Sequence, residues 1–424
     1  MKILFFMGMM LAGAVVAQIQ DEGWRYVVAP EAVEKQQGGK VLIRYDLNAV
    51  PLETSLNSVI WYKVKAAGEG LNPYLAMWAI ENDWQDGAQK IERVGEVVLH
   101  PNVDAPIPFP VSGYVRNHLR ERKISFLIEP QGAPGFSQAL EFSGQPSLAI
   151  VKAQKPRYDL RELLRPVWKG SRIANETLLP TSYDGKPAEA NLAFVPSRIV
   201  SVENYALDKT YEEGKDFTFD GRTLRLTPGR SIPLFKYEEL YHDNPDAKPG
   251  VMRTVDGGYM TFSESALFND KQLAVTYDHS KPWKGPIPQP AKRLLSKSFR
   301  IMEKGEPLKL VVFGDSISTG ASSSGATIRP PYMSRWGDLV ADELHRHYGS
   351  EIDYLNPSLG GMTSEWGRKT VDGLVSFEKP DLVILGFGMN DVWGPCSTEQ
   401  FISNTKAMME LIRRKNPDAE FILL

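Results

Sequence analysis

The stretch that most constrains the fold spans residues 309–320, where a short apolar run ends in a serine-bearing turn. Residues 310–313 are continuously apolar, the pattern of a strand that is buried on both faces. Gly314 and Asp315 interrupt this pattern at once, so Ser316 should lie at the carboxyl end of the strand. Ligands bind at this end of the strands in open parallel sheets. We therefore expect residues 305–424 to form a site-bearing α/β domain.

Strands and helices alternate after Ser316. Further strands are expected at residues 352–355, 382–387 and 421–424. Helices are expected at residues 334–348 and 364–377, and a third, after a capping box of Ser397 and Gln400, should run to about Lys415. This alternation predicts a parallel sheet with helices on both faces.

Three of these strands end in turns that combine glycine with polar residues, and the turns contain Ser316, Gly361 and Asn390. The carboxyl ends of parallel strands share one edge, so the three turns can converge. Acyl transfer needs a hydroxyl nucleophile and fixed N–H donors for the oxyanion. Ser316 offers its hydroxyl and backbone N–H, and Gly361 an N–H that no Cβ shields. Asn390 offers a side-chain amide.

The turns resemble, in order and spacing, the first three sequence blocks of the SGNH (GDSL-type) hydrolases. The matching segments are Gly-Asp-Ser-Ile-Ser at 314–318, Asn-Pro-Ser-Leu-Gly-Gly at 356–361 and Gly-Met-Asn-Asp at 388–391. The resemblance implies a flavodoxin-like, doubly wound parallel sheet and an ester hydrolase that uses no metal or cofactor.

By the same resemblance Ser316 is the nucleophile, and Gly361 and Asn390 complete the oxyanion hole. Gly360 takes the place of Gly361 if the register slips by one residue. Asp315 and Asp391 would hold two of the turns in shape.

The general base is missing from this pattern. The family places a histidine in a late Asp-x-x-His block, but no histidine follows Asn390. His345 and His347, in the helix after the nucleophile turn, are expected at the surface. We interpret the chain as truncated in its fourth strand and expect it to be poorly active. The alternative is a pseudoenzyme.

Residues 23–155 read as a β-sandwich, with strands expected at 41–47, 58–64, 74–80, 123–128 and 147–151. The module resembles a secreted sandwich that accompanies polysaccharide enzymes. Trp61, Trp78 and Trp84 could form a sugar-stacking platform. Alternatively Trp61 and Trp78 are core residues and only Trp84 is exposed.

Residues 156–280 are expected to form a second β-rich module. Its clearest element is a hairpin at 216–226 with Asp220 and Gly221 as the turn. His242 and His279 are read as surface residues. A proline-rich linker and a lead helix should occupy residues 281–304.

The first residues have the features of a signal peptide at 1–17: Lys2, an apolar stretch, and a small-residue cleavage site before Gln18. The alternative is an uncleaved membrane anchor. No later stretch is expected to span a membrane, so the mature protein should be secreted or periplasmic. The balance of 49 basic and 52 acidic residues argues against nucleic-acid binding. Cys396 is the only cysteine, which excludes an intrachain disulfide, and it is read as a thiol at the rim of the site.

The sequence thus predicts a secreted serine esterase that removes acyl groups, most simply acetyl, from a carbohydrate through an acyl-Ser316 intermediate. One alternative is a hydrolase of lipid, aryl or thioester substrates. Another is a non-catalytic glycan-binding protein with a dead hydrolase domain. The loop at 322–331 is expected to shape substrate access or to be an ordinary surface loop.

Overall fold

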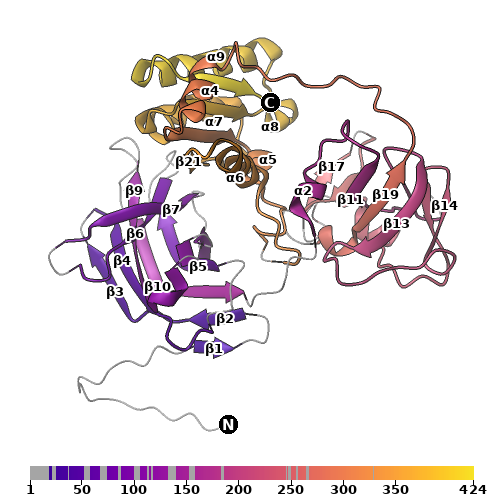
Figure 1. The fold of residues 1–424 in the computed structure, drawn as a ribbon, viewed down its shortest axis with the longest axis horizontal. Helices are drawn as coiled ribbons and strands as arrows, with labels where there is room; N and C mark the ends of the chain where they lie inside the picture. The colour runs from indigo at the N-terminus through magenta and orange to yellow at the C-terminus, as the bar shows by residue number, and fades with distance from the viewer. Residues whose placement is uncertain are drawn as a thin grey trace, which may run out of the picture. The chain divides into compact units, whose positions relative to one another are not determined.

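The computed structural model describes most of the chain from Ile19 onward (Figure 1). The described residues are 19–21, 25–36, 38–51, 58–66, 74–84, 87–99, 106–111, 114–115, 118–131, 140–151, 158–182, 186–244, 246, 250–254, 256–263, 267–327 and 329–424. The expected signal peptide lies outside them. The chain divides into two compact units, residues 1–153 with 372–378, and residues 154–371 with 379–424. Among the described helices, none is both long and apolar enough to cross a membrane.

The first unit contains two five-stranded antiparallel sheets. One has the order β1 (Ile19–Asp21), β2 (Arg25–Val28), β10 (Leu140–Val151), β5 (Ser58–Ala66), β8 (Pro106–Pro110). The other has the order β3 (Ala32–Gln36), β4 (Lys40–Asp46), β9 (Lys123–Gln131), β6 (Tyr74–Ile80), β7 (Lys90–Val98). All five strands that the sequence predicted here are present. The β-rich character of the module is therefore confirmed.

Residues from both sheets enter one hydrophobic core. Ile60 and Tyr62 of β5 are fully buried in it together with Ile43 of β4 and Phe126 of β9. On β5, Trp61 and Lys63 are less buried than Ile60, Tyr62 and Val64, which is the two-residue period of a pleated strand, whereas residues 124–129 of β9 are buried without interruption. A single core with contributions from both sheets is what holds this module together.

Trp61, Trp78 and Trp84 do not form one sugar-stacking platform. Trp61 lies on β5 and Trp78 on β6, so they belong to different sheets. Neither is part of the main core; Trp78 packs with Trp84 against a small separate cluster around Leu42. Trp84 is only half exposed, and its indole N–H donates to a Glu34 carboxylate oxygen at 3.0 Å.

The middle of the chain forms three small antiparallel sheets. Their orders are β11 (Arg172–Leu178), β19 (Leu273–His279), β13 (Pro196–Asn204); β12 (Glu189–Asn191), β15 (Thr223–Leu226), β14 (Phe217–Asp220); and β16 (Tyr241–His242), β18 (Tyr259–Thr261), β17 (Val251–Arg253). Short helices are α2 (Leu160–Leu163) and α3 (Tyr237–Leu240). The predicted hairpin is confirmed, although Asp220 pairs with Thr223, so its turn residues are Gly221 and Arg222.

His279 is not a surface residue, contrary to the prediction. Its side chain is buried, stacks on Phe194 at a ring separation of 4.0 Å, and contacts the Lys281 carbonyl oxygen through Nδ1 at 2.8 Å. The local sequence contains no sign of this burial, because Phe194 is 85 residues away along the chain. His242 is half-buried and contacts Thr261.

The C-terminal domain is built on a four-stranded parallel sheet with the order β21 (Ile352–Leu355), β20 (Leu308–Gly314), β22 (Leu382–Gly386), β23 (Glu420–Leu423). Its helices are α4 (Ser296–Glu303), α5 (Ser316–Thr319), α6 (Trp336–Tyr348), α7 (Ser364–Leu374), α8 (Met389–Trp393) and α9 (Thr398–Lys415). The predicted parallel sheet is confirmed. The expected domain boundaries stay predictions.

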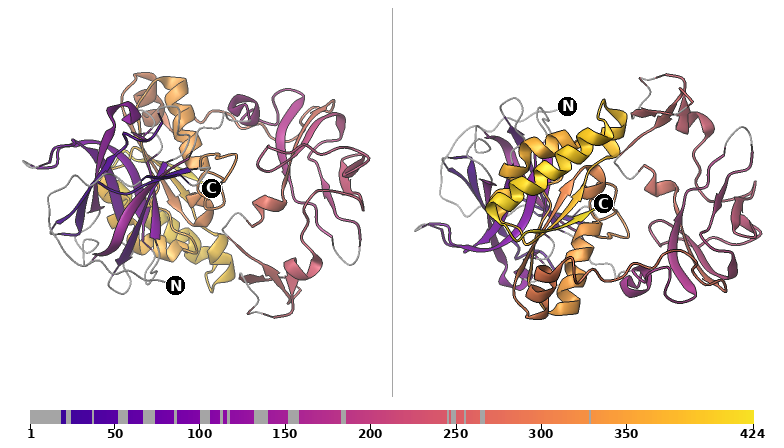
Figure 2. Two further views of the ribbon diagram at one scale, coloured as in Figure 1. Left: turned by 90° about the horizontal axis from the view of Figure 1, so that it is seen from below. Right: turned by 90° about the horizontal axis from the view of Figure 1, so that it is seen from above.

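Helices cover both faces of this sheet (Figure 2). On one face Leu310 and Val312 of β20 pack with Ala341 of α6. On the other face Phe313 contacts Trp366 of α7 at a ring separation of 5.5 Å. Successive residues of β20 thus point to opposite faces, and both are covered, which explains its uninterrupted apolar sequence.

Two local features differ from the prediction. Ser397 caps α9 by accepting the Gln400 backbone N–H at 3.2 Å, but the Gln400 side chain donates to Asn404 instead of returning to the cap. Asn390 lies within the short helix α8 and not in an open turn.

Candidate active site

The three predicted site residues follow three neighbouring strands. Strand β20 lies between β21 and β22, so the turns with Ser316, Gly361 and Asn390 leave the sheet at one edge. The Asn390 amide nitrogen Nδ2 lies 2.9 Å from the carbonyl oxygen of Met362, which follows Gly361. It lies 3.4 Å from Oδ2 of Asp315, which precedes Ser316. The structure therefore brings the three turns together, as expected.

Ser316 is held at the start of helix α5 by its neighbour. Asp315 is the N-cap residue, and its Oδ1 accepts the Ile317 backbone N–H at 3.0 Å. The Asp315 backbone N–H donates to the Gly386 carbonyl at 3.2 Å, which ties the turn to strand β22. Ser316 itself is half-buried. A reactant can therefore approach its hydroxyl while the backbone beneath it stays fixed.

Gly314 allows the close packing under this turn. A Cβ at this position would lie 2.1 Å from the Gly386 carbonyl oxygen and 2.2 Å from the Ser318 hydroxyl. These separations are far below van der Waals contact. Glycine is thus required here by the approach of two strands and the nucleophile turn.

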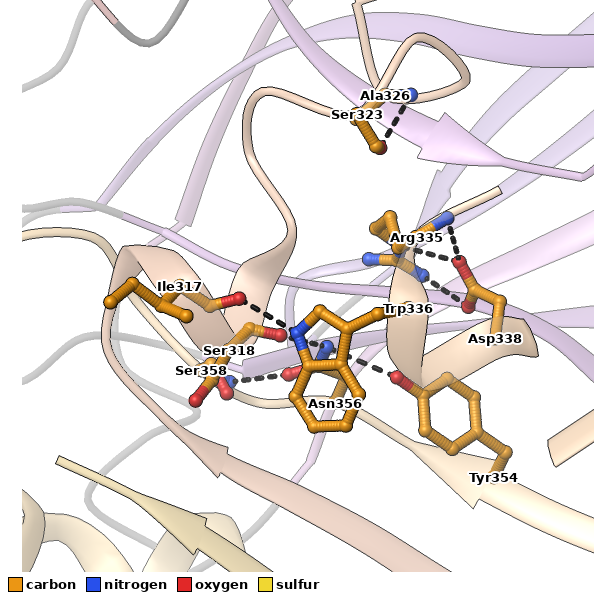
Figure 3. Close-up of polar contacts among 10 residues, drawn as sticks. All are labelled: Ile317, Ser318, Ser323, Ala326, Arg335, Trp336, Asp338, Tyr354, Asn356 and Ser358. Carbon is orange, nitrogen blue, oxygen red and sulfur yellow. Dashed lines mark hydrogen bonds and ion pairs between the residues drawn. The ribbon is translucent and has the colours of Figure 1, made fainter. Parts of the chain in front are cut away.

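The turn after β21 is bonded directly to the nucleophile turn. The Asn356 side-chain amide donates to the Ser318 carbonyl at 2.9 Å and to the Tyr354 hydroxyl at 3.1 Å (Figure 3). The Ser358 hydroxyl accepts the Gly314 backbone N–H at 2.9 Å, and Leu359 N–H donates to the Gly314 carbonyl at 3.1 Å. These bonds fix the segment that leads to Gly361.

Gly361 has a φ of 77°, in the left-handed region that glycine adopts without strain. It is exposed, and a Cβ built on it would meet no atom within 4 Å. Gly360 is half-buried. The backbone of Gly361 is therefore open to a reactant, with no side chain in the way.

A buried polar network supports the turn of Asn390. Asp391 accepts the Ser364 backbone N–H at 2.9 Å through Oδ2 and the Ser364 hydroxyl at 2.5 Å through Oδ1. The Asn404 amide donates to the same hydroxyl at 3.0 Å. All three side chains are buried. The network joins α8, the start of α7 and α9.

Burial shifts the pKa of two groups near the candidate site, the Asp315 carboxyl and the Cys396 thiol. Burial raises the pKa of Asp315, and the negative charge of Asp391 adds to the effect, although backbone N–H groups oppose it. Burial also raises the pKa of Cys396, and Asp391 acts in the same direction. Cys396 is thus less prone to form a thiolate, and its place at the rim of the site stays a prediction. Among the residues that the structure describes, no group of three or more His, Cys, Asp or Glu could hold a metal ion.

The two late histidines lie away from the nucleophile. The Trp336 indole N–H, at the start of α6, donates to the Ile317 carbonyl at 2.8 Å (Figure 3). His345 and His347 come nine and eleven residues later, roughly 14 and 17 Å further along the axis at about 1.5 Å per residue. His345 Nδ1 instead contacts the Ser350 carbonyl at 2.7 Å. Neither is placed to take the Ser316 proton.

An open cavity of about 510 Å³ adjoins Ser316. Its walls include Phe262 from the middle module together with Ile317, Met333 and Trp336. The sequence indicated only that the loop at 322–331 could shape substrate access. It gave no signal for Phe262, which lies more than fifty residues before Ser316.

Residues 312–424 match the GDSL-like Lipase/Acylhydrolase family. An arylesterase from Vibrio mimicus is 31% identical over 105 residues, which are 25% of this chain and 48% of that protein. This chain thus spans about half the length of that curated relative.

Two solved structures are also similar. The crystal structure of TesA is 27% identical with a TM-score of 0.23, over 27% of this chain and 58% of that one. A two-domain esterase active on acetylated mannans is 23% identical with a TM-score of 0.27, over 31% of this chain and 33% of that one.

Proposed function

We propose that the GDSL-like lipase/acylhydrolase domain of this chain hydrolyses carboxylic esters with Ser316 as the nucleophile. The observation that carries the proposal is the meeting of three strand-end turns, in which Asn390 Nδ2 lies 2.9 Å from the Met362 carbonyl and 3.4 Å from Asp315. The 31% identity to an arylesterase supports the same reaction class.

In the proposed mechanism Ser316 Oγ attacks the ester carbonyl carbon. The carbonyl oxygen becomes negative and is stabilised by backbone N–H groups of Ser316 and Gly361 and by the Asn390 amide. The bond to the alcohol then breaks, and the alcohol leaves with a proton. Water attacks acyl-Ser316, releases the carboxylic acid and restores the serine. None of these steps uses a metal or an organic cofactor.

The proposed substrate is an acyl ester, most simply an acetyl ester, of a carbohydrate. Two features support this choice: the cavity beside Ser316 is lined by hydroxyl and apolar side chains, and two β-rich modules precede the catalytic domain. We propose that the first module is a β-sandwich, because both of its sheets share one core. We propose export to the periplasm or beyond from the leader at 1–17.

An aryl ester is the second candidate substrate, because the curated relative is an arylesterase. Release of acetate from acetylated xylan, compared with hydrolysis of p-nitrophenyl acetate, separates the two candidates. Ser316→Ala should reduce both reactions to background, and mass spectrometry should find an acetyl group on Ser316 in the unsubstituted protein. Ser403→Ala, an exposed serine on α9, is the matched control. Hydrolysis that survives Ser316→Ala would exclude the mechanism.

A further inference from the structure

The cavity beside Ser316 has walls from two regions of the same compact unit. Ser316, Ile317 and Trp336 belong to the catalytic domain, whereas Phe262 and Ser263 belong to the middle module. Its volume of about 510 Å³ lies within the range of about 300–1,000 Å³ typical of small-molecule sites. The residues of the middle module are therefore positioned to contact a substrate bound at Ser316.

Phe262 is presented to the cavity by a fixed piece of backbone. Thr261, the residue before it, is buried; its hydroxyl donates to the Glu239 carbonyl at 2.6 Å and contacts His242 Nε2 at 2.6 Å. The Phe262 backbone N–H donates to the Gly250 carbonyl at 2.9 Å. Phe262 is nevertheless 43% exposed. An exposed ring on an anchored backbone is suited to binding and is not needed for packing.

The loop after the nucleophile is anchored by a buried serine. Ser324 is fully buried, and its hydroxyl accepts the Met333 backbone N–H at 2.7 Å. Burial raises the pKa of Tyr205, a residue of the middle module, and Ser324 opposes this rise. The hydrogen bond to Ser324 therefore fixes the backbone of Met333, which lines the cavity.

The facing wall is equally fixed. The Trp336 indole is oriented by its hydrogen bond to the Ile317 carbonyl, and Arg335 at the start of α6 is paired with Asp338 at 2.8 and 3.0 Å (Figure 3). Among the described residues that line the cavity, none carries an ionisable side chain other than a hydroxyl. Such a lining suits an uncharged group, because a buried charge would have no partner.

We propose that this cavity is the subsite for the alcohol part of the ester, and that Phe262 selects alcohols that contain an uncharged ring with an apolar face. Sugar rings and aryl rings share this chemistry, and both can pack on an aromatic side chain. The proposal rests on Ser316 being the nucleophile of the proposed esterase. It makes the middle module part of the substrate site.

The first test compares acetyl esters with and without a ring: phenyl acetate, an acetylated methyl xyloside and ethyl acetate. Phe262→Ala should raise KM for the ring-bearing esters about five-fold, the effect of losing one aromatic contact, and leave ethyl acetate unchanged. Phe262→Tyr should retain the original KM. An effect on only one ring-bearing ester would show which ring the subsite takes. Equal changes for all three esters would overturn the proposal.

Met260→Ala is the matched control, because Met260 lies two residues before Phe262, is 37% exposed and is not part of the cavity lining. It should leave all three KM values unchanged. Unfolding temperatures of the three variants should match that of the unsubstituted protein, since both side chains are largely outside the core.

The second test separates this proposal from the proposed function. In the Ser316→Ala background the esters act as ligands that are not hydrolysed, and NMR titration measures their Kd. Adding Phe262→Ala should raise Kd for phenyl acetate about five-fold. An unchanged Kd would overturn the role of Phe262 even if the protein is an active esterase. Absence of hydrolysis by the unsubstituted protein, with the Kd difference intact, would overturn only the proposed function.

Discussion

The side-chain amide of Asn390 donates to the backbone carbonyl of Met362 at 2.9 Å. This bond joins the turn that follows β22 to the turn that follows β21, across the strand that leads to Ser316. The same amide nitrogen lies 3.4 Å from Asp315, a long contact that an oxyanion can displace. One side chain thus joins the two turns, and in the proposed mechanism it also supplies a donor to the oxyanion hole.

Replacing Asn390 by alanine should reduce kcat by about 10²–10³-fold, the usual effect of losing one oxyanion donor, with a small change in KM. Steady-state kinetics with p-nitrophenyl acetate would measure both parameters. Asn416→Ala is the control, because Asn416 also donates to a carbonyl, that of Pro380 at 2.7 Å, but just before the start of β22. Similar losses in the two variants would argue against a direct role for Asn390.

Replacing Asp391 by alanine should lower the free energy of unfolding by about 1–3 kcal/mol, because the buried N–H and hydroxyl of Ser364 would lose their acceptor. Urea denaturation would measure the change. Asp391→Asn should lose less, since the amide oxygen can still accept one of the two bonds. Equal stability of the unsubstituted protein and the two Asp391 variants would show that water replaces the carboxylate as acceptor.

The raised pKa of Asp315 predicts a pH-dependent cost in stability. The folded state binds this proton more tightly than the unfolded state, so the cost is absent below the unfolded pKa, near 3.8. It develops as the pH rises through the folded value. Asp315→Asn should therefore gain stability relative to the unsubstituted protein as the pH rises toward neutrality. Denaturation midpoints at several pH values would show this difference. Asp418→Asn, at an exposed residue, is the control, and its midpoints should run parallel to those of the unsubstituted protein.

Replacing Gly314 by alanine should destabilise the domain by about 1–3 kcal/mol or more, because the added methyl group would clash with the Gly386 carbonyl and the Ser318 hydroxyl. The nucleophile turn should also shift and hydrolysis should fall. Gly229→Ala is a suitable comparison, since a Cβ there meets no atom within 4 Å. A fully active and stable Gly314→Ala protein would contradict the close packing described here.

Replacing His345 and His347 by alanine should leave the rate of ester hydrolysis unchanged, because both lie far along α6 from the nucleophile. Steady-state kinetics with p-nitrophenyl acetate would compare both variants with the unsubstituted protein. A loss of activity in either histidine variant would contradict this reading.

The sequence was most informative where short-range patterns determine structure. The apolar run before Ser316 predicted a buried strand, and three strand-end turns with glycine predicted a shared edge. Parallel pairing of β20 with β21 and β22 confirms this arrangement. In the first module, five expected strands are present because alternating or continuous apolar residues mark them.

Features that depend on distant residues were not predictable. His279 is buried and stacks on Phe194, and Trp61 is separated from Trp78 because β5 and β6 belong to different sheets. Strand β7 was missed because its sequence, Lys90–Val98, begins with charged residues and has a register shift against β6. Phe262 reaches the cavity only through the folding of a separate module.

Ser324 has no exposed surface although it lies in a loop, and its hydroxyl accepts the backbone N–H of Met333, which lines the cavity beside Ser316. A protein shortened to start after the middle module would lose Phe262 and Ser263 from the cavity wall. Under the proposed subsite, moving residues 305–424 onto another scaffold should therefore change which alcohol groups the cavity accepts.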